Sequence, residues 1–216
     1  MLHHLYGILE RPPQASRLPD TGVDDGPVVT RRIGALVVLS SLVAAVPRVT
    51  PYALSRHRDI QAVAASPGPF FPLPYGVTVP SVEMEGWLAV RAGVIRQGLR
   101  MVRGRVEMRV SVLALRLGEA DPARLCTVAD RVAEATGLAT WRSRIAGRGA
   151  NTAISLAFLV PRADVASFLA RIAPVAAHAG SVAVVPSGPW PATTFVPALD
   201  VPGSRVTPPA AVPYAV

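Results

Sequence analysis

Four histidines are the side chains best suited to metal binding or proton transfer, and they are scattered through the chain as His3, His4, His57 and His178. His3 and His4 are adjacent on an expected strand, so their rings should point to opposite faces of a sheet instead of converging on one ion. We therefore predict surface histidines at the N-terminus and no metal site. For His57 we expect a hydrogen-bonded ring on the face of a helix.

The acidic and thiol groups do not form a catalytic pattern either. Glu107 has Arg105 and Arg109 two residues to either side, and residues two apart on a strand share a face, which predicts a row of ion pairs. We favour this structural ladder over acid–base catalysis, because few acids are present and they form no close carboxylate pair. The single cysteine, Cys126, excludes an intramolecular disulfide and falls at a core-facing helical position. We expect no cofactor and no enzyme activity.

Composition indicates a folded, basic protein. Half of the 216 residues are apolar, 17% are charged and the net charge is +8; all 22 basic residues are arginine. A chain without lysine cannot carry the lysine of a nucleotide-binding P-loop. Arginine suits contacts with carboxylates as well as phosphates. No signal peptide is visible, and the apolar run 33–46 is too short for a bilayer crossing, so we expect a cytoplasmic protein that does not bind membranes.

The first half of the chain predicts a small α+β domain, residues 1–103. Its expected elements, in order, are a strand at 4–9, a loop at 11–30, a strand at 33–40, a helix from Thr50-Pro51 that stops before Pro67, an extended edge segment at 70–79, and a long helix capped by Ser81 and ending near Arg103. The glycines of the last helix, Gly86, Gly93 and Gly98, each weaken it by about 1 kcal/mol relative to alanine, so packing must hold it.

The second half predicts a ferredoxin-like domain, residues 104–197, with the element order βαββαβ. The expected elements are strands at 105–115, 138–146, 152–160 and 181–186, and helices at 121–137 and from 165 to Gly180. Strands 105–115 and 152–160 should be central, because the second is apolar on both faces. The arginine-rich strand 138–146 should lie at an edge, with two helices on one face. The Pro-, Val- and Ala-rich tail, 198–216, is either disordered or an apolar arm on the surface.

A rigid block, Gly188-Pro189-Trp190-Pro191, closes this domain and is followed by Phe195. Each proline fixes φ and lacks an amide donor, so the backbone around Trp190 should be extended and should leave the sheet there. We interpret the block as a packing corner, with Trp190 largely buried between the end of the sheet and the N-terminal domain.

Together with this block, four further segments resemble the GvpL/GvpF family of gas vesicle proteins. They are Leu5-Tyr6-Gly7-Ile8, Phe71-Pro72-Leu73-Pro74-Tyr75-Gly76, Gly104-Arg105-Val106-Glu107-Met108 and Ala157-Phe158-Leu159-Val160-Pro161-Arg162. The five segments occur in the family's order and cover roughly residues 2–197. The chain departs from the family at Pro74, where an arginine is usual, and at Phe195, which follows the proline-rich turn at a longer distance.

The resemblance implies an accessory or minor structural protein of gas vesicles, located in the cytoplasm and at the vesicle. Its implied partners are the small, very hydrophobic major shell protein and other gas vesicle accessory proteins, during nucleation or growth of the shell. Apolar burial would supply most of the affinity, while arginines would discriminate partners by pairing with their acids. The candidate arginines are Arg96, Arg100 and Arg103 on the long helix and Arg142 and Arg144 on the edge strand.

Two other classes of function stay open on the sequence. A basic ferredoxin-like domain can bind RNA, but such modules carry stacking aromatics on their two central strands, and here those strands offer only Phe158. An enzyme could instead assemble its site from isolated residues in a cleft between the two domains.

Overall fold

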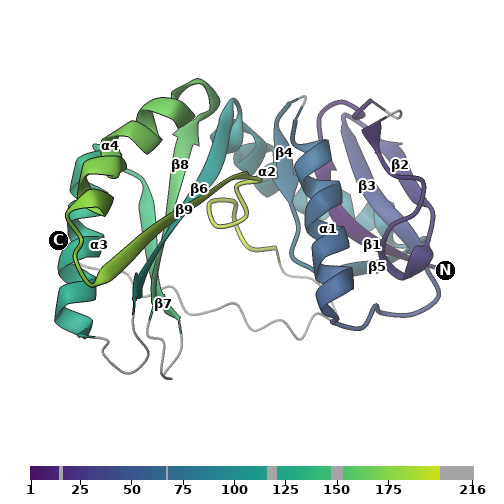
Figure 1. Cartoon of the computed structure of the whole chain (residues 1–216). Coiled ribbons are helices and arrows are strands. Elements are labelled where there is room, and N and C mark those ends of the chain that lie inside the picture. The colour runs from purple at the N-terminus through teal and green to yellow at the C-terminus, as the bar shows by residue number, and fades with distance from the viewer. Residues whose placement is uncertain (15–16, 67, 116–120, 147–152, 200–216) are drawn as a thin grey trace. The chain divides into compact units, whose positions relative to one another are not determined.

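The computed structural model describes residues 1–199 except 15–16, 67, 116–120 and 147–152, so almost all of the predicted tail, 198–216, lies outside the described residues. The chain forms an α+β protein with two antiparallel sheets, each in its own compact unit (Figure 1). Of the described residues, the first unit contains those of Met1–Gly104 and 191–199, and the second contains those of Arg105–Trp190. The segment 191–197, which the sequence analysis placed in the second domain, thus belongs to the first unit.

The sheet of the first unit is built around one central strand, β1. Its strands are β1 (Leu2–Leu9), β2 (Val28–Ile33), β3 (Leu36–Val43), β4 (Phe70–Pro72) and β5 (Thr78–Pro80). Their order is β2-β3-β1-β4, with β5 also paired to β1, and every pairing is antiparallel. The connection from β1 to β2 contains a short 3-10 turn, η2 (Val23–Asp25).

Two helices cover the two faces of this sheet. On one face, α1 (Pro51–Ala64) packs Ile60 against Tyr6 and Leu39. On the other, α2 (Met84–Val102) packs residues such as Leu99 against Leu5. Because β1 lies between both layers, consecutive side chains from His3 to Leu9 are all buried. This explains why its sequence is apolar without the alternation of a strand with one wet face.

The structure corrects two expectations for this unit. The predicted strand 33–40 is split, because Gly34 has φ 57° and forms the turn between β2 and β3, so β2 occupies the end of the predicted loop. Ser81 does not cap α2: the helix begins after Glu83, without a side-chain cap, and the Ser81 hydroxyl donates to the Met1 carbonyl at 3.1 Å. The edge role of 70–79 is divided between β4 and β5.

The second unit follows the predicted element order. Its elements are β6 (Arg105–Ala114), α3 (Pro122–Thr136), β7 (Trp141–Ala146), β8 (Ala153–Pro161), the 3-10 turn η3 (Arg162–Asp164), α4 (Val165–Ala177) and β9 (Val182–Trp190). The antiparallel sheet has the order β7-β8-β6-β9. The central placement of 105–115 and 152–160 and the edge placement of 138–146 are therefore confirmed. Both helices lie on one face of this sheet (Figure 1).

Local signals explain why α3 has the predicted boundaries. The Asp121 carboxylate accepts from the Ala123 amide at 3.0 Å, and Pro122 occupies the first helical turn. Gly137 ends the helix with φ 62°, a left-handed conformation that favours glycine. Between these caps, Leu125, Val128 and Val132 face the sheet.

The last strand differs from the prediction. The predicted strand 181–186 is too short, because β9 continues through Trp190, whose backbone lies opposite Glu107. A register shift between Glu107 and Arg109 accommodates the extra residue, and Gly188 takes φ 122° within it. Trp190 is also 40% exposed, so the expectation that it is largely buried is wrong; its ring lies on an edge strand instead of inside a core.

Two glycines of α2 should respond oppositely to alanine. A Cβ at Gly98 would meet the ring of Phe71, which is itself buried, whereas a Cβ at Gly93 would meet nothing within 4 Å. We expect Gly98→Ala to lower the free energy of unfolding by about 1–2 kcal/mol through overpacking. Gly93→Ala should raise it by up to about 1 kcal/mol through helix propensity. Urea denaturation of the full chain measures both, and equal effects of the two variants would contradict the packing assignment.

Candidate functional site

Four aromatic side chains, three of them buried and one half-buried, form a cluster between β1 and α1. It consists of His4 and Tyr6 from β1, His57 from α1, and Tyr75 from the turn after β4. Their ring centroids lie 5.1–5.5 Å apart, mostly in tilted or edge-on arrangements. We call these four residues the His–Tyr cluster. Sequence reasoning missed it, since its members come from three separate segments of the chain, a strand, a helix and a turn.

Hydrogen bonds fix the proton positions in the two histidines of the His–Tyr cluster. Nε2 of His57 lies 3.0 Å from the Leu73 carbonyl, which can only accept, so this nitrogen carries the proton. In a neutral ring Nδ1 of His57 is then an acceptor, and Nε2 of His4 donates to it at 3.0 Å. Nδ1 of His4 is left as a buried acceptor with no partner among the described residues. His4 thus donates to His57, and His57 donates to the main-chain carbonyl of Leu73.

The predicted exposure of the two N-terminal histidines is wrong. His3 is 6% exposed and His4 is fully buried. They do point to opposite faces of β1, but both faces are covered, and Nδ1 of His3 lies 2.9 Å from the Ser40 hydroxyl. The prediction for His57 agrees with the structure, since its ring is buried on the helix face and hydrogen-bonded. Within the described part of the chain, no group of three or more His, Cys, Asp or Glu residues is placed to hold a metal ion.

The same network joins two of the motifs noted in the sequence. The Gln61 amide donates to the carbonyls of Tyr6 at 2.7 Å and Leu73 at 2.8 Å, which links β1 to the segment after β4. The Tyr6 hydroxyl accepts from the Val23 amide and contacts the Ser41 hydroxyl, each at 2.8 Å. Gly76 ends the segment with φ 90°, which favours glycine. These motif residues therefore hold the first unit together.

Burial keeps the cluster neutral. Desolvation, reinforced by the neighbouring His57, lowers the pKa of His4 to about 3. Desolvation also lowers the pKa of His57 to about 4; the bond to the Leu73 carbonyl opposes this shift and the charge of Arg58 adds to it. Burial raises the pKa of Tyr6. Near neutral pH the side chains of His4, Tyr6 and His57 therefore stay in their neutral forms. The arrangement suits a structural role better than acid–base catalysis.

Glu107 occupies a second buried polar position, on β6 of the other unit. Its side chain is fully buried, and Oε1 lies 2.6 Å from Nε of Arg109. This ion pair forms one side of the predicted row; Arg105 lies at the exposed start of the strand. A Cβ on Gly188 would lie 2.9 Å from the Glu107 carbonyl oxygen and 3.0 Å from the Met108 sulfur. The Gly-Pro-Trp-Pro block therefore packs its glycine directly onto β6 beside Glu107.

Trp190 presents its ring on the sheet face that the helices leave open. Val106 and Met108 point into the helix-side core, so Glu107 and its cross-strand partner Trp190 point the other way. The indole donates to the Ser187 hydroxyl at 3.3 Å. The residues from Val185 to Trp190 are all exposed on β9, which ends the strand order of the sheet. Phe195, in contrast, is buried, at 6% exposure.

The five candidate arginines are divided between the two units. Arg96 and Arg100 are exposed on α2, and Arg103 follows that helix and pairs with both carboxylate oxygens of Glu10, at 2.7 and 2.9 Å. Arg142 is exposed on β7. Arg144 also lies on β7, where its backbone is opposite Ser155 of β8, while its side chain is not among those described.

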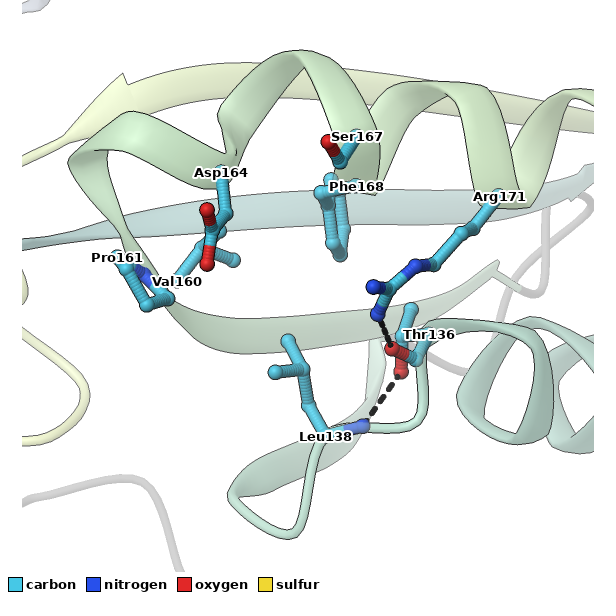
Figure 2. A pocket seen from close by; sticks show the side chains of 8 residues that line it. All are labelled: Thr136, Leu138, Val160, Pro161, Asp164, Ser167, Phe168 and Arg171. Atoms are coloured by element: carbon cyan, nitrogen blue, oxygen red, sulfur yellow. Dashed lines mark hydrogen bonds between the residues drawn. The ribbon is translucent and has the colours of Figure 1, made fainter.

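A shallow hollow in the second unit lies between the start of α4 and the end of α3. Leu138, Val160 and Phe168 form its apolar lining, and Arg171 donates to the Thr136 carbonyl at 2.7 Å beside them (Figure 2). The hollow is open to solvent and has a cavity volume of only about 30 Å³, far below the 300–1,000 Å³ of usual ligand pockets. Its one basic group is engaged by the main chain, so the hollow is poorly suited to an anionic substrate.

The described sheet also lacks an aromatic platform for RNA on its central strands. Phe158, the aromatic residue of β8, is fully buried and packs on Phe168 of α4, with centroids 5.3 Å apart. It therefore points to the helix side, where a base cannot stack. Separately, no helix among the described residues is both long and apolar enough to span a bilayer.

Comparisons with known proteins match both units. A sequence model of the family described as gas vesicle synthesis protein GvpL/GvpF matches residues 2–126 and 123–197. The crystal structure of the gas vesicle protein GvpF from Anabaena sp. PCC7120 superposes with a TM-score of 0.76 at 16% identity, over 93% of this chain and 98% of that chain. For GvpF from Microcystis aeruginosa the TM-score is 0.73 at 12% identity, over 91% and 99%. At these identities the two structures establish a common fold. No curated protein sequence matches significantly.

The neutral histidines predict acid sensitivity of the first unit. Between about pH 6.5 and pH 4 His57 binds a proton in the unfolded chain but not in the folded one. The free energy of unfolding is therefore highest above pH 6.5 and decreases as the pH is lowered through this range. For His57 alone the loss approaches roughly 3 kcal/mol below about pH 4. The measurement is urea denaturation across this range in a Trp141→Phe/Trp190→Phe background, where Trp87 of the first unit is the remaining tryptophan.

Two histidine variants test the origin of this effect. His57→Gln should reduce the pH dependence, whereas His178→Gln, at an exposed position after α4, should preserve it. A pH dependence that persists in full in His57→Gln would contradict the assignment to this histidine.

Proposed function

Because the chain belongs to the GvpL/GvpF family of gas vesicle synthesis proteins, we propose that it binds the hydrophobic major shell protein and assists nucleation or growth of the gas vesicle. It acts in the cytoplasm and at the vesicle, as an accessory or minor structural component, together with other gas vesicle accessory proteins. We assign it no enzymatic reaction, cofactor, nucleic acid or membrane. We assign the second unit to the ferredoxin-like class, which its strand order β7-β8-β6-β9 supports, and we propose that it serves as a rigid scaffold.

The observation that carries this proposal is the exposed end of β9. Trp190, which is 40% exposed, and Val185, which is 46% exposed, both lie on this outer strand. Exposed apolar side chains on a sheet edge suit contact with another apolar protein surface. Pro186 and Pro189 remove amide donors from this edge, which limits open-ended strand addition. The edge can therefore cover an apolar partner without itself starting aggregation.

Co-expression with the major shell protein tests the proposal. We expect this chain to keep the shell protein soluble and to co-purify with it. Trp190→Ala should reduce the shell protein recovered by several-fold, while lowering the free energy of unfolding by only about 1–2 kcal/mol, because the ring is partly exposed. Tyr52→Ala removes an aromatic ring that is 69% exposed on α1 and is the matched control, with no expected effect. Absence of any complex, with both proteins folded, would overturn the proposal.

The salt dependence of the complex should reflect mainly apolar contact. Raising the ionic strength from about 0.1 to 1 M shortens the Debye length from about 10 to 3 Å and should leave most of the complex intact. Charge reversal at Arg142 should slow association more than it speeds dissociation, as expected for a charge at the rim of an interface. Both rates can be measured by surface-based kinetics on immobilised complex components. Dissociation in 1 M salt would indicate an electrostatic interface instead.

A further inference from the structure

One face of α2 is apolar and uncovered. Val90 is 82% exposed, Val94 40% and Met101 38%. With them on this face lie Gly86, Gly93 and Gln97, all exposed. These six residues, which we call the outer face of α2, recur every three or four positions. They form one stripe on the side away from Leu88, Ile95 and Leu99, which pack into the core of the first unit.

The glycines of the outer face are not required by close packing against any described residue. Gly98 is needed where α2 crosses Phe71, since a side chain there would strike the ring. At Gly86 and Gly93 an added Cβ would meet nothing within 4 Å. Each of these two positions weakens the helix without allowing any close contact in the described structure. A partner whose backbone approaches the helix closely would explain why glycine occupies these two positions.

The spacing on the outer face suits a second helix. Gly86, Val90, Gly93 and Gln97 follow intervals of four, three and four residues, which is the interval of a seam between two helices that cross at a shallow angle. The residues at this seam are small or apolar, apart from Gln97.

The charges beside the outer face define the partner further. Arg96 and Arg100 flank it on one side, and neither has an acidic partner among the described residues. The acidic residue of α2, Glu85, already pairs with Arg31 at 2.9 Å. A second copy of this chain would therefore bring no free carboxylate from its own α2 to these arginines. A helix with acidic residues along one flank would satisfy them.

We propose that the outer face of α2 docks an amphipathic helix of the major shell protein, which contributes an apolar stripe to the seam and acidic side chains to Arg96 and Arg100. The proposal rests on the proposed function for the identity of the partner. It adds a helix-binding surface in the first unit to the strand edge of the second. The shell protein would then have both helical and extended apolar surfaces covered before it is incorporated.

The first test places a bulky side chain in the seam. Gly93→Gln should lower the shell protein recovered on co-expression at least five-fold, although it raises helix propensity and keeps the fold, as thermal denaturation will verify. Ala62→Gln, at an exposed position of α1, is the matched control and should leave recovery unchanged. The double reversal Arg96→Glu/Arg100→Glu should also reduce recovery, and Arg58→Glu on α1 should not.

The second test locates the contact directly. A photo-crosslinking amino acid at Val90 should form a covalent adduct with the shell protein, mapped by mass spectrometry to a segment of helical periodicity with acidic residues. The same group at Tyr52 should not. If the unmodified chain recovers no shell protein, the proposed function fails. If it does recover it, but Gly93→Gln is without effect and Val90 gives no adduct, the docking surface alone is refuted. An adduct between two copies of this chain would also refute it.

Discussion

The first unit depends on the burial of β1 between two helical layers. A strand covered on both faces hides its polar groups from water, so they depend on partners inside the protein; among the described residues of this strand, Nδ1 of His4 is the exception. His4 and Tyr6 lie on this strand, and Gln61 and His57 on α1 reach down to its carbonyls and rings. Loss of one partner would leave its neighbours buried and unpaired, which costs more than the bond itself contributes.

This constraint also fixes the segment that follows α1. The Leu73 carbonyl accepts from both Gln61 and His57, so the chain after β4 is tied to the helix as well as to β1. Gly7 allows β4 to pack closely on β1, because a side chain at this position would collide with the ring of Phe70. The motifs at 5–8 and 71–76 are therefore parts of one packing problem, although about 65 residues separate them.

Sequence reasoning succeeded where local signals were sufficient. The caps at Asp121 and Gly137 set the limits of α3, and the two-sided apolar pattern of 152–160 identified a central strand. It failed where the outcome depended on distant packing. Alternation placed His3 and His4 on opposite faces correctly, but nothing local indicated that both faces are covered. The prediction for Trp190 was wrong for the opposite reason. A large aromatic residue between prolines suggests a buried position, but Trp190 lies at the end of the edge strand β9 and is exposed.

The glycines of α2 illustrate what a structure adds to such reasoning. In the sequence Gly86, Gly93 and Gly98 are equivalent, and each weakens the helix. In the structure Gly98 is explained by a neighbouring ring of the same unit, while the other two face open space beside exposed valines. The packing of the first unit requires a glycine at Gly98, but it does not require one at Gly86 or Gly93. Exposed apolar residues and unexplained glycines on one face are therefore stronger evidence of a partner than either is alone. The arginines beside them have no acidic partner among the described residues, which favours an acidic partner.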